Sequence, residues 1–303
     1  MIVQFLADFQ PSRYRKMSFI ILSTLLWLAW ALSFDSSLEV TCNYFYFLFL
    51  GIIGAIFANT TGAGGGVIFI PIFNSLELSE LQALSTSFAI QCFGMTAGTL
   101  TWWRYYKEKI KHGSQQISSE WSQYPIILKC CIPASIAGLW LCQLANLQPP
   151  QSMPFTFGVF SIVLGVILGL NSIYRNKYSG DQVLSKKGLY TIVLVSFLGG
   201  IITGWLSVGV GELIVIYLLL KRTAPIVAIA AGVTVSAATV WASAYIHFTP
   251  SAQTYFQIVL FAGPGAILGG LLARRIVTLL SIKNLKLVFS CWIISSGIFM
   301  LLL

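Results

Sequence analysis

The stretch that decides the fold is GAIFANTTGAGGGV, residues 54–67, where four glycines within five positions interrupt a long apolar run. The run extends from about Tyr44 to Phe73. It is too long for one membrane crossing of roughly 20 residues and too short for two crossings joined by a loop. Glycine lets the backbone turn sharply and come close to a ligand. The stretch therefore predicts a hairpin of one longer helix and one half-helix, which enters and leaves the membrane on the same side.

A second stretch, GIITGWLSVGVGEL at residues 200–213, interrupts the apolar run from about Gly188 to Leu220 in a similar way. Its Gly-x-Gly lies 147 residues after the first one, because Gly209 follows Gly62 and Gly211 follows Gly64 at that distance. A hydroxyl cluster comes after each stretch: Ser85, Thr86 and Ser87 in the first case, Thr234 and Ser236 in the second. The matching order indicates an internal repeat with one broken helix hairpin in each half.

The composition places both hairpins in a membrane. Only 9% of the residues are charged and 57% are hydrophobic, whereas an ordinary soluble domain has about 25% charged residues. Backbone polar groups in lipid must be satisfied internally, and the long apolar runs show no alternation, so helices are expected. The fold class predicted is an all-α polytopic membrane protein. Apart from the two hairpins, full spans are expected at about Met17–Phe34, Leu84–Trp103, Pro125–Leu147, Met153–Tyr174, Pro225–His247, Tyr255–Ala273 and Leu287–Leu303.

The positions of the basic residues predict the orientation. Cytoplasmic loops hold an excess of Lys and Arg. With the N-terminus in the cytoplasm and each broken region treated as a hairpin, all 18 basic residues fall on the cytoplasmic side. Counting either hairpin as a full crossing would break this pattern. The two hairpins then enter from opposite faces, so the repeats are predicted to be inverted. The protein is expected in the plasma (inner) membrane as a multi-pass protein.

Three segments follow from this topology. Residues 1–43 form a basic tail with the first apolar span, residues 44–174 form the first repeat, and residues 175–303 form the second. The basic cluster before the first span also resembles a signal peptide, so this span is either a retained signal anchor or a cleaved segment. We expect retention, because the small-residue cleavage signal after the span is poor.

The broken helices indicate an anion site. Half-helices that start at Gly64 and Gly211 would present unpaired N–H groups and a positive helix end inside the membrane. Breaks at corresponding positions of inverted repeats are typical of transporters and point to the substrate site. Neutral donors nearby would hold an anion and still release it. The alternative is that these small residues only allow close helix packing. The candidate substrate-binding residues are Thr60, Thr61, Gly62, Gly64, Gly65, Gly66, Thr86, Ser87, Gln91, Ser207, Gly209, Gly211, Thr234 and Ser236.

Glu212 is the only acidic residue deep in a predicted apolar region. A carboxylate inside a membrane is costly and is a functional hypothesis by default. Glu212 could bind and release a proton, which would remove a charge that repels the anion and would couple proton to substrate. The alternative is a residue that only satisfies the positive end of its half-helix. His112 and His247 are expected to be ordinary polar surface residues.

Other classes of function are disfavoured. The basic residues flank apolar spans and form no groove for nucleic acid, and the absence of a CxxC pair gives no sign of a metal site. No Walker motif occurs, and no His pair, Asp pair or Ser/His arrangement supports an intramembrane enzyme. A passive anion channel remains an alternative to a carrier. The expected partners are a small anion, protons or another coupling ion, and the lipid bilayer. No cofactor is expected, and the oligomeric state stays open.

The residues of the first repeat resemble a known family. GAGGGVIFIP at residues 62–71, followed by ALSTSF at residues 83–88, is similar to the sulfite exporter TauE/SafE family, also called the toluene sulfonate uptake permease family. The resemblance covers roughly residues 50–303. The second repeat departs from the pattern, because Glu212 and Leu213 replace glycines, the proline is missing, and Thr234-Val235-Ser236 only approximates Thr-Ser. The resemblance implies secondary transport of sulfite, thiosulfate, sulfonates or related anions.

Overall fold

The computed structural model describes residues 13–34, 36–113, 115–174, 184–249, 252–279 and 282–302, and these residues form helices without any strand. The chain divides into two compact units, Met1–Phe45 and Tyr46–Leu303. The first unit contains α2 (Arg13–Leu32) and the short α3 (Ser37–Tyr44), which meet at a sharp bend. The predicted first span corresponds to α2. The side chains of Arg13, Arg15 and Lys16 lie outside the described residues.

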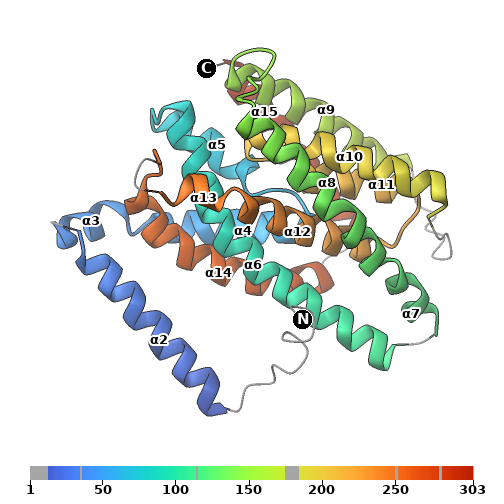
Figure 1. Ribbon diagram of the computed structural model, residues 1–303, viewed down its shortest axis with the longest axis horizontal. Helices are drawn as coiled ribbons and strands as arrows, with labels where there is room; N and C mark the ends of the chain where they lie inside the picture. The colour runs from blue at the N-terminus through green and yellow to red at the C-terminus, as the bar shows by residue number, and fades with distance from the viewer. Residues whose placement is uncertain are drawn as a thin grey trace. The chain divides into compact units, whose positions relative to one another are not determined.

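The second unit contains the two hairpins and the remaining predicted spans (Figure 1). Its helices are α4 (Phe47–Thr61), α5 (Gly66–Ser75), α6 (Glu80–His112), α7 (Gln115–Ser122), α8 (Tyr124–Leu144), α9 (Met153–Tyr174), α10 (Lys186–Leu206), α11 (Val210–Leu220), α12 (Pro225–Ala242), α13 (Ala244–His247), α14 (Phe256–Leu279) and α15 (Ile282–Leu302). Several boundaries differ from the prediction: α6 and α14 run beyond the spans expected at Leu84–Trp103 and Tyr255–Ala273. The span expected at Pro225–His247 is broken near Ser243 into α12 and α13.

Five of the described helices are long and apolar enough to cross a membrane, or six if α2 and α3 form one bent span. The five comprise α8 extended back to Ser119, the Met153–Leu170 part of α9, and α10, α12 and α14. Helices α4, α5 and α11 are apolar but shorter, and so is the Leu287–Leu302 part of α15, where a full span was expected. The predicted span in α6 is not among the five, because Ser85, Thr86, Ser87 and Gln91 make its apolar part more polar. The chain is a multi-pass membrane protein, as predicted.

Both glycine stretches form the predicted breaks. Helix α4 ends at Gly62, which has a left-handed backbone with φ of 81°, and α5 begins at Gly66. Helix α10 ends at Ser207 with φ of 59°, and Gly209 has φ of 139° immediately before α11. These φ values suit glycine and strain residues with a Cβ atom. Each hairpin therefore has a longer first helix and a shorter second helix, joined by a tight turn.

The helices of the two halves pack in a reciprocal pattern. Helix α4 of the first half packs against α14 of the second, while α10 of the second half packs against α8 of the first, and α9 packs against α15. Figure 1 shows α8 and α10 side by side. The first helix of each half thus contacts the fifth helix of the other half, and the sixth helices contact each other.

Glycines produce the same close approach in both of these helix pairs. A Cβ atom added to Gly51 would collide with the carbonyl of Ala262, and one added to Gly265 with the carbonyl of Leu48. In the other pair, Gly200 lies against the carbonyl of Ser135, and Gly138 lies against that of Phe197. Small residues at such crossings let backbones approach closely inside a membrane.

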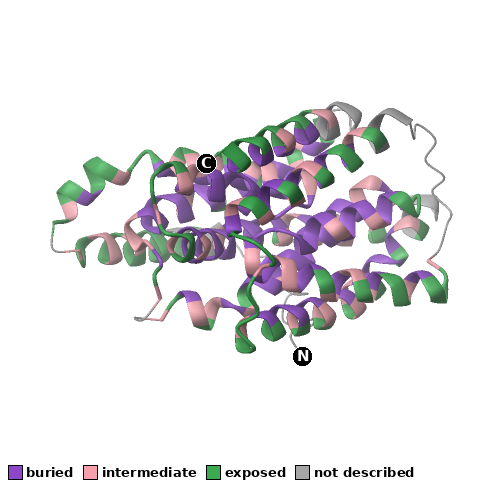
Figure 2. Ribbon diagram, turned by 90° about the horizontal axis from the view of Figure 1, so that it is seen from above, coloured by how far each residue is buried: buried purple, intermediate pink, exposed green. Residues whose placement is uncertain are grey.

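The burial pattern suits a lipid environment. In Figure 2 the buried residues of the second unit line its interior, while exposed residues cover the outward faces of its helices. Many of these exposed residues are large and apolar, including Phe155, Val163, Leu194, Leu198 and Leu268. Water would disfavour such faces, whereas lipid tails solvate them.

Candidate functional site

The two hairpin turns meet in the interior of the second unit. The first turn is residues 62–65, and the second turn is residues 207–209. Glu212, in the first turn of α11, connects them. Its Oε1 accepts a hydrogen bond from the amide of Gly64 at 2.7 Å, and its Oε2 accepts one from the amide of Gly209 at 2.8 Å. Glu212 is only 3% exposed, so one carboxylate binds an amide of each turn in a buried place.

Gln91 from α6 forms a second connection between the turns, and this one is neutral. Its Oε1 accepts the amide proton of Gly65 at 2.9 Å. Its Nε2 donates to the hydroxyl of Ser207 at 2.7 Å and to the Ser207 carbonyl at 3.1 Å. Ser87, one helical turn before Gln91, adds a hydroxyl 2.9 Å from the Ser207 hydroxyl. Four predicted site residues from three segments thus form one buried polar network.

The glycines at the turns are required by close backbone contacts. A Cβ atom on Gly64 would lie 3.1 Å from both the Gln91 Oε1 and the Ser207 carbonyl oxygen. A Cβ atom on Gly66 would lie 2.6 Å from the same carbonyl oxygen, and one on Gly211 would collide with the Gly62 carbonyl and the Ser236 hydroxyl. Larger residues would therefore push the two turns apart.

A buried hydroxyl without a hydrogen-bond partner among the described residues lies beside the turns. Ser236 of α12 is 2% exposed, and its hydroxyl has no hydrogen-bond partner among the described residues. It lies against Gly211 at the start of α11. Buried polar groups are normally paired, so an unpaired hydroxyl beside the N-terminus of α11 is a candidate hydrogen-bond donor for a ligand.

Four other predicted residues have different surroundings. The hydroxyls of Thr60 and Thr61 donate back to the Phe57 carbonyl at 3.0 Å and 2.7 Å. Thr86 accepts the amide proton of Tyr255 at 2.9 Å, on a loop before α14. Thr234 pairs with the hydroxyl of Tyr124 at 2.7 Å. Thr86 and Thr234 therefore lie outside the network of the turns, and their hydroxyls already have partners.

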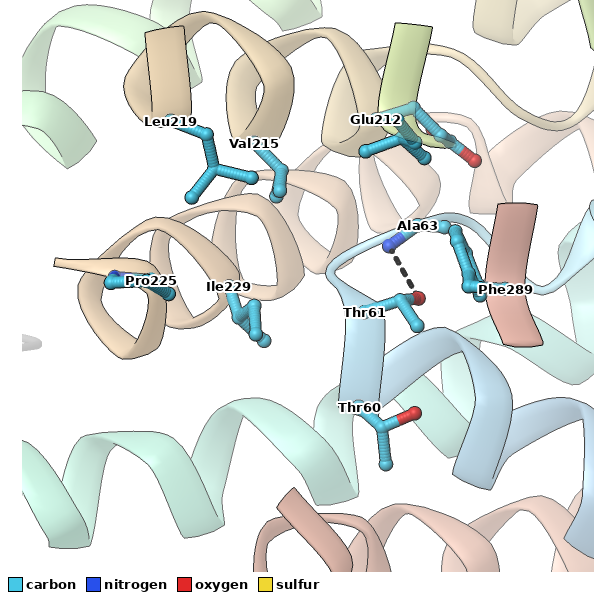
Figure 3. Close-up of a pocket in the computed structure, with 10 residues that line it drawn as sticks. Thr60, Thr61, Ala63, Glu212, Val215, Leu219, Pro225, Ile229 and Phe289 are labelled. Atoms are coloured by element: carbon cyan, nitrogen blue, oxygen red, sulfur yellow. Dashed lines mark hydrogen bonds between the residues drawn. The ribbon is translucent and has the colours of Figure 1, made fainter. Parts of the chain in front are cut away.

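A cavity of about 30 Å³ adjoins Glu212 (Figure 3). That volume has room for about one water molecule. Thr60, Thr61 and Ala63 border it at the end of α4, and Val215 and Leu219 border it on α11. The remaining lining residues are Leu168, Pro225, Ile229 and Phe289. Glu212 is the only charged side chain among the lining residues.

A larger hollow of about 340 Å³ lies at the start of α6 and beside α13. Its lining includes Leu81, Ser85, Tyr245 and Gln253. The small cavity extends toward Pro225, at the start of α12, whereas this hollow lies near the end of that span. In the orientation predicted from charge, the two spaces are therefore on opposite sides of the hairpin turns.

Several contacts could not be read from the sequence. Thr203, one helical turn before the break, accepts the amide proton of Val210 at 2.9 Å and so caps α11 from the preceding helix. Nothing in its local sequence distinguishes it from other buried threonines. The surface assignment of His247 is wrong, because its ring is 3% exposed and stacks on Phe88 with centroids 4.5 Å apart. A polar residue near a span end looks exposed in the sequence, but α13 turns it inward.

The described side chains offer donors for an anion rather than ligands for a metal. No group of three or more His, Cys, Asp or Glu residues converges among them. The six cysteines are free thiols. The two carboxyl oxygens of Glu212 lie between the turns, and each accepts an amide proton from one turn.

The sequence matches one known protein family over most of its length. Residues 47–300 match the family described as Sulfite exporter TauE/SafE, which covers both hairpins and every helix of the second unit. Comparison with curated proteins and with solved structures gives no match. The matched family consists of transporters of sulfur-containing anions, not of enzymes. The chain belongs to the sulfite exporter TauE/SafE family.

Proposed function

We propose that this protein is a secondary transporter that carries a small sulfur oxyanion or organosulfonate, such as sulfite, thiosulfate or a sulfonate, across the membrane. The observation that carries the proposal is the meeting of two glycine turns, one from each half, with amide and hydroxyl donors directed at one buried place. The substrate-binding groups are the backbone of both turns together with Ser87, Gln91, Ser207 and Ser236.

The donors at this place suit an oxyanion. Backbone amides at helix N-termini bind anions through hydrogen bonds and through the helix dipole. The Glu212 carboxylate accepts from both turns at 2.7 Å and 2.8 Å, and a sulfite or sulfonate group has oxygens that can accept in the same way. Apart from Glu212, the network is neutral, which allows the anion to be released again.

The reciprocal helix packing supports alternating access. Two halves related by a two-fold axis would place α4 against α14 and α10 against α8, as observed. We infer that residues 44–174 and 175–303 are inverted repeats, and that movement of one against the other exposes the turns to each side in succession. The spaces of about 30 Å³ and 340 Å³ would be parts of the two access routes.

Glu212 is proposed as the coupling residue. An ionised carboxylate about 4 Å from a bound anion would repel it by about 4 kcal/mol at an effective dielectric constant near 20. Protonation of Glu212 would remove this repulsion. A proton that crosses together with a monovalent anion also cancels the electrical work of about 2.3 kcal/mol per charge per 100 mV. For a monovalent anion, such as a sulfonate or hydrogensulfite, the transport step is therefore proposed to carry one proton with the anion.

The proposed setting is the inner membrane with the N-terminus in the cytoplasm. Basic residues of the predicted cytoplasmic side lie over aromatic rings, as at Lys109 and Tyr105, 5.1 Å apart, and at Lys221 and Tyr217, 5.7 Å apart. Lys and Arg beside Trp and Tyr are typical of a membrane interface. Lys283 and Lys286 have undescribed side chains, and Arg175 and Lys177 lie outside the described residues.

The test is uptake by the purified protein in liposomes. Sulfite, thiosulfate, short sulfonates and carboxylates are offered one at a time, with and without a pH gradient. The proposal expects saturable uptake of a sulfur oxyanion or sulfonate that exceeds uptake of a carboxylate. Flux that never saturates and cannot be driven by a second gradient would favour the passive channel instead.

A further inference from the structure

Both carboxyl oxygens of Glu212 accept hydrogen bonds, and the two donors belong to different halves of the protein. The amide of Gly64 belongs to the hairpin of the first half, and the amide of Gly209 belongs to that of the second. We call these two hydrogen bonds the Glu212 bridge. The bridge occupies donors that the proposed function assigns to the transported anion, so the carboxylate and the substrate compete for the same N–H groups.

We propose that the Glu212 bridge is a connection between the two hairpins that protonation of Glu212 releases. In the empty site, the ionised side chain takes the place of the substrate and holds the two turns together. This inference rests on the proposed function. When the side chain is ionised, the turns are joined and their amides are occupied. When it takes a proton, the turns separate from it and the anion takes its place.

The chemistry of the carboxyl group gives the release step. An ionised carboxylate is an acceptor only, so each oxygen can accept a backbone N–H. Protonation by hydronium converts one of these oxygens into a hydroxyl, which accepts an N–H more weakly than an ionised oxygen does. At least one of the two hydrogen bonds therefore weakens, and the carboxyl group loses its charge. The cavity at Thr60, Thr61 and Ala63 gives a water molecule a place beside Glu212.

Among the described residues around Glu212, no other charged group competes with it for this role. The lining of the cavity has no second charged side chain. The helices packed against α11 are α9, α10 and α12. Their titratable residues are Lys186, Lys187 and Tyr190 at the exposed start of α10 and Tyr174 at the end of α9, whose side chain is undescribed. Tyr217 on α11 itself donates to the Gly188 carbonyl at 2.9 Å.

The Gln91 connection provides an internal contrast. It also joins the two turns, through Gly65 and Ser207, but its amide does not titrate. Acidification should therefore weaken the contacts made by Glu212 and leave those made by Gln91. The protection of individual turn amides against hydrogen exchange can distinguish these two connections without any substrate.

The experiment is hydrogen–deuterium exchange of the purified full chain in detergent, followed in peptides that contain residues 62–66 and 207–210. After correction for the intrinsic effect of pH, acidification of the unaltered protein should raise exchange in both peptides. Glu212→Ala should raise it at least tenfold at neutral pH and remove the pH effect. Glu212→Gln keeps one acceptor and should expose fewer amides than Glu212→Ala. Peptides from α8 and α14 report whether each variant remains folded.

Two control variants sharpen the result. Glu77→Gln changes an exposed carboxylate and should leave exchange in both peptides unchanged. Gln91→Leu should raise exchange in the first turn by the same factor at every pH. Thiosulfate added to Glu212→Ala should restore protection of the turns, because the anion takes the place of the carboxylate.

The inference is overturned if Glu212→Ala, with α8 and α14 still protected, exchanges at the turns as slowly as the unaltered protein. It is also overturned if the unaltered protein shows no pH effect on the two peptides. Either result would leave the proposed anion transport intact. Failure of the proposed function would appear separately, as absence of saturable uptake by liposomes that contain the unaltered protein.

Discussion

At the scale of single residues, the site depends on backbone groups more than on charged side chains. Gly64 and Gly66 let the first turn approach Ser207 closely enough for Gln91 to bind both turns. Ser236 adds a buried hydroxyl that has no partner among the described residues. A neutral backbone site of this kind can bind an anion and release it again, because no positively charged side chain holds the anion in place.

A Cβ atom on Gly64 should impair transport. In Gly64→Ala it would lie 3.1 Å from the Gln91 Oε1 and the Ser207 carbonyl oxygen, so the turns must shift apart. We expect at least a tenfold loss of uptake rate with folded protein retained. Gly188→Ala is the matched control, because its nearest neighbour would be 3.4 Å away, an ordinary contact. Equal uptake by the two variants would place the site elsewhere.

The Ser236 hydroxyl should contribute to anion affinity and not to stability. It makes no hydrogen bond among the described residues, so Ser236→Ala breaks none of them. One hydrogen bond to the anion is worth about 1 kcal/mol, which weakens binding roughly fivefold. The measurement is the Kd of thiosulfate by calorimetry. Ser196→Ala, whose hydroxyl bonds the Ile192 carbonyl in its own helix, is the control and should bind normally. Unchanged affinity in Ser236→Ala would remove Ser236 from the site.

At the scale of helices, two similar pairs hold the hairpins in place. Helices α4 and α14 approach at Gly51 and Gly265, and helices α8 and α10 approach at Gly138 and Gly200. In all four cases an added Cβ atom would meet a backbone carbonyl rather than a movable side chain. These contacts position the first helix of each hairpin and therefore its turn.

Substitutions in either pair should destabilise the protein by similar amounts. Gly51→Val and Gly200→Val insert side chains against the carbonyls of Ala262 and Ser135. Overpacking of this kind costs about 1–3 kcal/mol. Thermal unfolding in detergent should show lower Tm for both variants than for Gly188→Ala. A large effect in one pair without an effect in the other would contradict the equivalence of the two halves.

Much of the helix arrangement could be predicted from the sequence. Both breaks, the order of long and short helices and most span positions follow from apolar run length and glycine clusters, which are local signals. The break between α12 and α13 could not be predicted, because Ser243 ends α12 within an apolar stretch. The contacts of Glu212 could be predicted only in part. A lone buried acid is visible in the sequence, but its partner Gly64 is 148 residues away, and only tertiary structure brings them together.

At the scale of the whole molecule, alternating access requires the two hairpins to open toward opposite sides of the membrane. The sequence predicts this from charge alone, and the reciprocal helix packing agrees with two halves of matching architecture. The side of the membrane is a prediction that labelling can check. Ser114 and Ser179, which the charge pattern also places inside, lie outside the described residues.

Single-cysteine labelling of cells should assign the two faces. In a variant without native cysteines, Gln151→Cys should react with an impermeant reagent from outside, because this exposed residue lies between α8 and α9. Lys221→Cys, exposed after α11, should react only after the membrane is opened. Labelling of Lys221→Cys in intact cells would mean that the second hairpin is a full crossing.

Transport at the glycine turns can be measured as uptake of radiolabelled thiosulfate and sulfite by the purified protein in liposomes, with and without an imposed pH gradient. We predict saturable uptake of at least one of these anions that accelerates when protons flow with it. Gly64→Leu should abolish uptake, and Glu212→Gln should retain exchange between equal pools while losing accumulation driven by the gradient. If uptake through Gly64→Leu equals that of the unaltered protein, the glycine turns do not form the transport site.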